Sequence, residues 1–127
     1  RGVDVRILTP EIPDKKYAYA VTQSSYKELL ESGVSIYQYT PGFNHGKTFV
    51  VDDDYAVVGT INLDYRSLYL HFECGVWMYK TRSVEQVKSS TLKAFEKSEE
   101  ITLEYVKGIP KIKRIFRSVL KIFAPLL

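Results

Sequence analysis

The chain has 127 residues, of which 45% are hydrophobic and 26% charged, and these shares are those of a globular domain with its own core. Its single cysteine, Cys74, excludes an intrachain disulfide framework, and its apolar runs all fall short of the roughly 20 residues of a membrane span. The net charge of +3 is unevenly distributed, since residues 107–127 carry six basic side chains and no acidic one. Residues 1–106 carry twelve basic and fifteen acidic side chains, so a mildly acidic body precedes a basic tail.

The first part of the chain predicts two strands with a helix between them. Residues 3–9 alternate apolar and polar side chains, which predicts a strand that Pro10 ends. Residues 14–32 have an apolar face typical of a helix, and Gly33 follows in the position of a C-cap. Residues 34–39 predict the second strand.

The middle of the chain predicts three further strands. Residues 47–51 and 55–59 predict the third and fourth strands, and the three aspartates at 52–54 predict a tight hairpin turn between them. Residues 72–80 predict a fifth strand that is apolar enough to be central in a sheet.

The chain then returns to helical patterns. Ser83 has the features of a helix N-cap, and Gln86 completes a capping box with it. Residues 96–104 are mostly polar and indicate a solvated surface. Because strands and helices alternate first and strands cluster later, we expect an α/β fold with a mixed β-sheet flanked by helices.

The stretch from residue 44 to residue 62, N-H-G-K-T-F-V-V-D-D-D-Y-A-V-V-G-T-I-N, carries the chemistry. Residues two apart on an extended strand point to the same face, so His45 and Lys47 project together. Thr60 and Asn62 have the same spacing and also share a face. We expect these four side chains to form one site.

An imidazole, an ammonium, a hydroxyl and an amide would therefore meet in this site. Imidazole attacks as a nucleophile or transfers protons, and an ammonium suits a phosphate oxygen. A hydroxyl and an amide can donate hydrogen bonds to charge that develops on a phosphoryl group. The consecutive aspartates 52–54 are poorly placed to share a metal ion, and His, Cys and carboxylates show no metal-ligand spacing. The expected chemistry is phosphoryl transfer without a metal or other cofactor.

Each of these side chains alone has an ordinary explanation, because a lone histidine is more often structural and a lone lysine is usually a solvated charge. The joint pattern H-x-K-x(4)-D-x(6)-G-[ST]-x-N rarely arises by chance, and it is the signature of the phospholipase D superfamily, which this chain resembles. The residues that match it are His45, Lys47, Asp52, Gly59, Thr60 and Asn62.

The resemblance extends beyond the motif and covers nearly the whole chain. The opening R-G-V-D-V-R-I-L-T-P-E-I-P-D-K-K, the lead-in Y-Q-Y-T-P-G-F-N-H and the follow-on N-L-D-Y-R-S are similar to bacterial cardiolipin synthases, specifically to their C-terminal catalytic half. The chain opens at Arg1 without a methionine and has one motif where the family uses two. We expect it to be part of a longer protein, with membrane segments and the first motif upstream.

The resemblance implies a division of work between two histidines. In the superfamily, the motif histidine of one half attacks phosphorus to form a phosphohistidine, and that of the other half protonates the leaving alcohol. We expect His45 to be the general acid and base; the alternative is that His45 is the nucleophile. His71, the only other histidine, lacks the following lysine of the motif and is expected to be structural or exposed.

The resemblance also implies roles for the remaining site residues. Lys47, Thr60 and Asn62 would bind the substrate phosphate, and Asp52 would be a catalytic residue that supports the site rather than touching substrate. Glu73, on the predicted fifth strand, corresponds to a glutamate that orients the histidine in single-motif relatives. The alternative for Glu73 is a buried strand glutamate paired with another cation.

The expected domains are a phospholipase D-like catalytic half-domain, residues 1–106, and the basic tail, residues 107–127. The spacing of Ile112, Ile115 and Phe116 is that of one apolar face of a helix that starts after Pro110 and ends before Pro125. Such a basic amphipathic helix would lie on an anionic membrane surface or pack against the missing half.

The expected function is that of a phosphatidyltransferase half-domain that makes cardiolipin and glycerol from two phosphatidylglycerol molecules. The expected partners are this anionic phospholipid, a membrane surface, and either the missing N-terminal half or a homodimer mate. The full-length protein would be located at the bacterial cell membrane, and this 127-residue chain by itself would be soluble or peripheral. The alternatives are a phospholipase D, a nuclease, or a non-catalytic membrane or interface module. We expect no nucleic acid, because positive charge lies in the tail rather than beside the motif.

Overall fold

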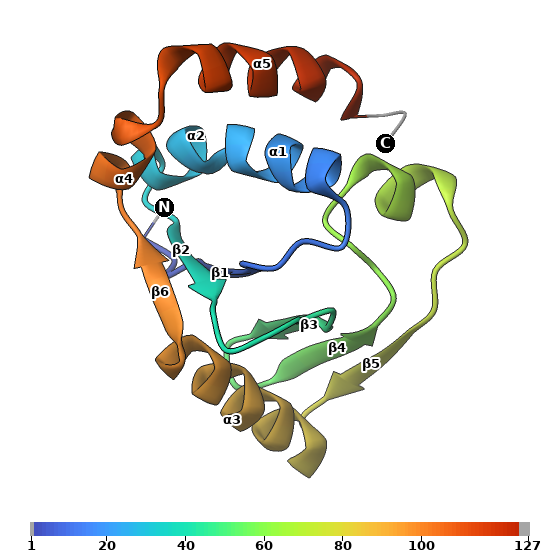
Figure 1. Ribbon diagram of the computed structural model, residues 1–127. Helices are drawn as coiled ribbons and strands as arrows, with labels where there is room; N and C mark the ends of the chain where they lie inside the picture. Colours follow the sequence, from blue (N-terminus) through green and yellow to red (C-terminus); the bar gives the residue numbers. More distant parts are fainter. Residues whose placement is uncertain (1, 125–127) are drawn as a thin grey trace. The chain divides into compact units, whose positions relative to one another are not determined.

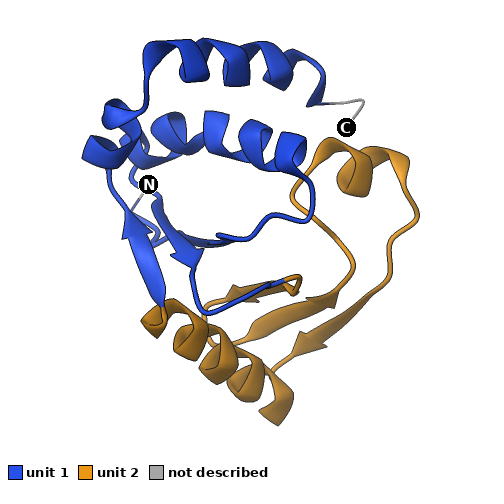
Figure 2. Cartoon of the chain, in the orientation of Figure 1, with its two compact units in different colours: residues 1–44, 98–127 blue, residues 45–97 orange. Residues whose placement is uncertain are grey.

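The structure is a computed structural model that describes residues 2–124 (Figure 1). The chain divides into two compact units, which Figure 2 distinguishes by colour. Unit 1 contains the chain up to Asn44 and again from Ser98 onward, and unit 2 is the continuous segment His45–Lys97. The whole H-x-K-x(4)-D-x(6)-G-[ST]-x-N motif therefore lies within unit 2.

Unit 1 is built on a three-stranded sheet in the order β1-β2-β6, with β2 parallel to β1 and antiparallel to β6. Parallel neighbours need a crossover connection, and helices α1 and α2 supply it. Helix α5 packs on α1, on the side away from the sheet (Figure 1). The elements of unit 1 are β1 (Arg6–Pro10), α1 (Lys16–Ser24), α2 (Tyr26–Glu31), β2 (Ser35–Tyr39), β6 (Ser98–Ile101), α4 (Leu103–Gly108) and α5 (Lys111–Ile122).

The core of unit 1 joins the crossover helix α2 to the sheet. Tyr26 of α2 packs with Ile36, Ile101 and Val106, and all four are buried. The hydroxyl of Tyr26 would be costly to bury alone, and it is satisfied by a 2.8 Å hydrogen bond with the side chain of Thr9. This polar pair fixes α2 against the end of β1.

Unit 2 is an antiparallel sheet in the order β3-β4-β5 with helix α3 packed on it. The buried side chains of Ala56 on β4 and Val84 on α3 mark this contact. The elements of unit 2 are β3 (Lys47–Val51), β4 (Tyr55–Gly59), the single π-helical turn η1 (Arg66–Leu70), β5 (Gly75–Tyr79) and α3 (Arg82–Glu96).

The register of this sheet is set where β4 approaches β5 at a glycine. Lys47 pairs with Gly59, and Gly59 pairs with Gly75. A Cβ on Gly59 would stand 2.2 Å from the carbonyl oxygen of Cys74 and 2.6 Å from the Cα of Gly75. Both neighbours are backbone atoms, so no side-chain rotation could relieve the clash. The motif glycine is thus required for close approach of two strands.

The expected α/β class with flanking helices is confirmed. One mixed sheet was expected, and the structure contains two separate sheets. Only the sheet of unit 1 is mixed, while that of unit 2 is wholly antiparallel. The predicted strands 47–51 and 55–59 and the turn between them are confirmed, since two short apolar runs separated by three consecutive aspartates specify a hairpin. The first strand begins at Arg6, three residues later than predicted.

The predicted fifth strand was too long and was placed wrongly in the sheet. β5 begins at Gly75, so Glu73 precedes the strand instead of lying on it. Within the described residues β5 pairs with β4 alone, which makes it an edge strand and not a central one. Both faces of β5 carry apolar side chains. A continuous apolar run of this kind predicts a central strand, although this strand lies at the edge.

Two helix predictions need correction. The predicted helix 14–32 is two helices interrupted at Ser25, where the neighbouring Ser24 hydroxyl donates to the carbonyl of Val21 and competes with the helical ladder. The capping box at Ser83 is wrong, because α3 starts at Arg82 and Ser83 lies inside its first turn.

Residues 96–104 are mostly exposed, as expected, but they also have regular structure that the sequence analysis did not predict. They contain β6 and the start of α4. Only Ile101 of β6 is buried, so the strand lacks an alternating pattern long enough to detect.

The predicted tail helix is confirmed as α5, with Pro110 at its start, while Pro125 lies outside the described residues. Helices within residues 2–124 are all too short or too polar to cross a bilayer. The expected boundary between a half-domain and a tail at residues 106 and 107 stays a prediction.

The close approach at Gly59 yields a stability prediction. Gly59→Ala should lower the free energy of unfolding of unit 2 by about 1–3 kcal/mol, because the backbone must shift to admit a Cβ. Gly75→Ala is the matched control, since its Cβ would meet its nearest neighbour, a side-chain atom of Val57, at an ordinary 3.4 Å. Urea unfolding followed by fluorescence of Trp77, the only tryptophan, reports on unit 2. Equal unfolding midpoints for the two variants would contradict this explanation of the glycine.

Candidate active site

The strand register gathers the two ends of the motif at one end of the unit 2 sheet. Lys47 begins β3, Gly59 ends β4 and Gly75 begins β5, and these three residues are paired across the sheet. The residues just outside these strand ends therefore lie at the same end of the sheet, which we call the motif edge. They are His45 before β3, Thr60 and Asn62 after β4, and Glu73 before β5.

The predicted pairing of His45 and Lys47 is present as a direct contact. The Lys47 Nζ atom lies 2.8 Å from Nδ1 and 2.9 Å from Nε2 of the imidazole, and it donates to the His45 carbonyl at 2.9 Å. The two side chains that the two-residue spacing predicts to project together therefore share one site, with a cation directly beside the imidazole.

Thr60 continues the β4–β5 ladder and holds Glu73 beside it. The Thr60 amide donates to the Cys74 carbonyl at 2.9 Å, and the Cys74 amide donates to the Thr60 hydroxyl at 3.0 Å. The hydroxyl in turn donates to a carboxylate oxygen of Glu73. The predicted phosphate-binding role of Thr60 stays a prediction, and in this structure its hydroxyl proton is directed to Glu73.

Hydrogen bonding keeps Glu73 ionised. Bonds from Thr60 and then from Ser67 hold the pKa of the Glu73 carboxyl below its ordinary value. Partial loss of hydration opposes this shift, and electrostatic interactions with His71 and Lys47 add to it. The carboxylate is thus a fixed negative group beside the motif lysine, and its predicted task of orienting His45 stays a prediction.

Ser67 is a site-supporting residue that the sequence analysis missed. It is buried, and its amide donates to the Asp64 carboxylate at 2.7 Å, which fixes the start of the turn η1. A short acid three residues before a serine is a local signal for such a capped turn. The stretch N-L-D-Y-R-S contains that spacing, which predicts the turn but not that Ser67 reaches Glu73.

Asp52 is the site residue that lies apart from the others. It follows β3 in the hairpin turn, is exposed, and has a φ of 51°. Since each strand residue advances the chain by about 3.3 Å, β3 separates Asp52 from Lys47 by more than 15 Å. Its part in catalysis stays a prediction. Asn62 is exposed beyond the end of β4, at the same end of the sheet as His45.

The second histidine has a local structural role. His71 is exposed, and its Nε2 accepts hydrogen bonds from Arg66 at 2.9 and 3.1 Å. The His71 amide also donates to the Arg66 carbonyl at 2.7 Å and closes the turn η1. This arrangement agrees with the expectation that His71 is structural or exposed.

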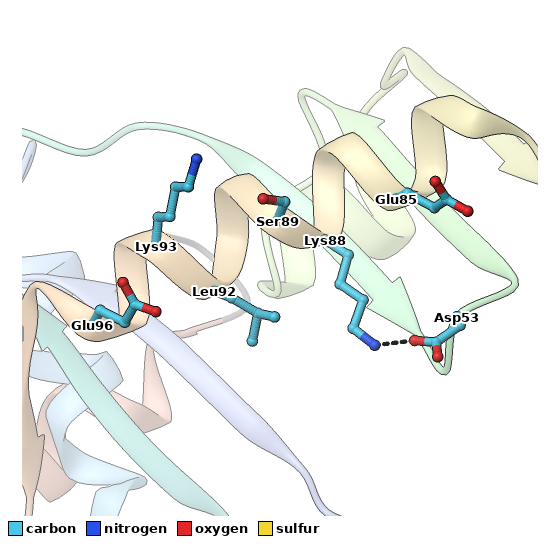
Figure 3. A pocket seen from close by; sticks show the side chains of 7 residues that line it. All are labelled: Asp53, Glu85, Lys88, Ser89, Leu92, Lys93 and Glu96. Atoms are coloured by element: carbon cyan, nitrogen blue, oxygen red, sulfur yellow. Dashed lines mark hydrogen bonds and ion pairs between the residues drawn. The ribbon is translucent and has the colours of Figure 1, made fainter.

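A shallow pocket along α3, which Figure 3 shows, lies away from the motif edge. Lys88 of α3 forms an ion pair there with Asp53 in the β3–β4 turn, at the opposite end of the sheet from His45. Acidic and basic side chains are mixed along this helix face, which is typical of a solvated surface. In the part of the chain that the structure describes, His, Cys, Asp and Glu side chains form no group of three that could hold a metal ion.

The hydrogen bond from Thr60 to Glu73 yields a pH prediction. Thr60→Val removes the largest cause of the low pKa of Glu73, so that pKa should rise toward its ordinary value. A depressed folded-state pKa stabilises the fold above the unfolded pKa, and this stabilisation is lost as the pH falls through the folded pKa. The variant should therefore lose less stability than the parent on acidification. A carbon-13 NMR titration of the Glu73 carboxyl measures the shift, with the exposed Thr48→Val as control. An unchanged Glu73 pKa in Thr60→Val would show that the Thr60 hydrogen bond is not what lowers it.

Comparison with known proteins places this geometry in a family. A family model described as the PLD-like domain of cardiolipin synthase matches residues 1–98. An uncharacterized protein of Streptococcus mutans is 46% identical over 127 residues, which are 100% of this chain and 28% of that protein. Cardiolipin synthases of Geobacillus kaustophilus and Alkalihalophilus pseudofirmus are 41% and 40% identical over 126 residues. Those matches cover 99% of this chain and 25% of each synthase, so the chain spans about a quarter of the length of these relatives. The predicted resemblance is confirmed, and the chain belongs to the phospholipase D-like domain family of the cardiolipin synthases.

Proposed function

We propose that this chain is one half of the active site of a phosphatidyltransferase that joins two phosphatidylglycerol molecules into cardiolipin. The observation that carries the proposal is the gathering of His45, Lys47, Thr60 and Asn62 at one edge of the unit 2 sheet. The direct contact between the Lys47 ammonium and the His45 ring supports a site built for an anionic phosphoryl group. Relatives named cardiolipin synthase support the choice of lipid substrate.

The reaction proceeds in two displacements at phosphorus. A histidine of the other half attacks the phosphorus of one phosphatidylglycerol, and the bond from phosphorus to the glycerol oxygen breaks. His45 gives its proton to the departing glycerol, which leaves as the free alcohol. The phosphatidyl group is now bound to the attacking histidine.

The second displacement restores both histidines. His45, now neutral, removes the proton from a hydroxyl of a second phosphatidylglycerol, and that oxygen attacks phosphorus. The bond to the other histidine breaks, and cardiolipin is released. Lys47 and Asn62 bind the phosphate oxygens and stabilise the negative charge of each transition state. No step requires a metal or another cofactor.

The mechanism needs two motif histidines, and this chain carries one motif. We therefore propose that the chain works with a second half that contains the first motif, or with a second copy of itself. Full-length relatives are about four times as long as the matched segment, which leaves room for that half. The complete protein would act at a bacterial membrane, where its lipid substrates are found.

The proposal predicts activity on mixing. The chain alone should be inactive on phosphatidylglycerol vesicles in the presence of EDTA. Adding a separately made first-motif half of the Geobacillus kaustophilus synthase should produce cardiolipin and glycerol. His45→Ala should then lower the rate by about 10²–10⁴-fold, because a general acid and base is lost. His71→Ala, the matched control, should retain turnover, because that histidine serves the turn η1. Lipid products are separated by thin-layer chromatography.

Each other result has a definite meaning. Cardiolipin from the chain alone would mean that two copies form a complete site. Phosphatidic acid as the main product would identify water as the acceptor and a phospholipase D. Inactive mixtures of folded proteins would overturn the catalytic proposal and favour an interaction module.

A further inference from the structure

Helix α5 turns its apolar face away from the protein. Ile112 is 78% exposed, Ile115 65%, Phe116 64% and Ile122 74%. These positions, with Val119, follow the spacing of one helix face, and every residue of α5 is at least partly exposed. An amphipathic helix on a protein surface ordinarily does the reverse and buries this face.

The basic face of α5 is the side that contacts unit 1. Lys121 lies 3.5 Å from a carboxylate oxygen of Glu28 on α2. Arg114 and Arg117, three residues apart on the same helix face, are half-buried where α5 packs on α1. The basic side of α5 therefore lies toward unit 1, and the apolar face is left exposed.

Two further basic residues border the apolar face. A helix turns by about 100° per residue, so Lys111 and Lys113 fall on opposite sides of Ile112. Both lysines are exposed. Their long side chains can place a charge in water while the stems lie along apolar surroundings. Residues 107–127 contain no acidic side chain that would repel an anionic surface.

We propose that the outward face of α5 inserts into the interface of an anionic lipid bilayer. The apolar side chains would enter the boundary between head groups and acyl chains, and Lys111 and Lys113 would contact lipid phosphates. The basic border favours an anionic membrane over a second copy of this chain, which would bring two positively charged tails together. The choice of lipid also rests on the proposed function, since the enzyme must reach a lipid substrate.

Co-sedimentation of the 127-residue chain with vesicles tests this surface. Binding should be stronger to phosphatidylglycerol vesicles than to neutral phosphatidylcholine vesicles, and salt should weaken it. The double variant Ile115→Asp with Phe116→Asp should bind about tenfold less or weaker still, because two large side chains lose their apolar burial. The matched control places aspartates at Val3 and Ile12, which are also exposed in unit 1, and should bind as the parent does.

A charge variant gives an independent test should the apolar variant fold poorly. Lys111→Glu with Lys113→Glu should weaken binding to phosphatidylglycerol vesicles and leave the circular dichroism spectrum unchanged. Binding that is equal for parent and both double variants would overturn the proposal. A different result would assign the face to a second copy of the chain. In that case the parent would form a dimer in analytical ultracentrifugation and not bind vesicles, and the Ile115 and Phe116 double variant would be monomeric.

The test separates membrane docking from catalysis. In the mixture with the first-motif half, Lys47→Ala should abolish phosphatidyl transfer, while vesicle binding by the Lys47→Ala chain should still depend on Ile115 and Phe116. If the proposed function failed while the α5 surface bound lipid, transfer would be absent and binding would still depend on Ile115 and Phe116. If the docking proposal failed alone, the mixture would still transfer phosphatidyl groups, and the Ile115 and Phe116 double variant would change neither vesicle binding nor transfer.

Discussion

At the end of β4 the backbone of Gly59 lies so close to β5 that a Cβ would come 2.2 Å from the Cys74 carbonyl oxygen. This contact holds the antiparallel ladder in one register, in which Thr60 exchanges hydrogen bonds with Cys74 and stands beside Glu73. The same register places Gly59 opposite Lys47, so the start and end of the motif meet. A slip of one residue would send every side chain to the other face and separate them.

The sheet also divides the motif by function. One end carries the imidazole, the ammonium, the hydroxyl and the amide, which are the groups that can attack, transfer protons and bind a phosphate. The other end carries the turn with Asp52, whose backbone is in the left-handed region, and with Asp53, which is paired to Lys88 on α3. In this chain the acidic end connects the hairpin to its covering helix, and the end with His45 and Lys47 is the proposed reaction site.

The sequence predicts the local features of this structure better than the distant ones. The β3–β4 hairpin follows from two short apolar runs around an aspartate turn, the contact of His45 with Lys47 follows from their two-residue spacing, and both are present. Periodicity does not encode pairing between distant segments. That pairing determines the division into two sheets, the edge position of β5 and the strand β6. The contact of Ser67 with Glu73 depends on the π-helical turn η1. The amphipathic pattern of the tail predicts α5, but which face contacts unit 1 depends on packing against α1, which is distant in sequence.

Phosphate binding at the His45 edge can be measured directly by NMR of the two imidazole rings. The 127-residue chain would be titrated with glycerophosphoglycerol, the water-soluble head group of phosphatidylglycerol. If the motif ends form one phosphate site, the His45 signals should shift saturably, those of His71 should not, and Lys47→Ala should remove the shift. His45 signals that stay unchanged, or that shift equally in Lys47→Ala, would contradict a phosphate site at this edge of the sheet.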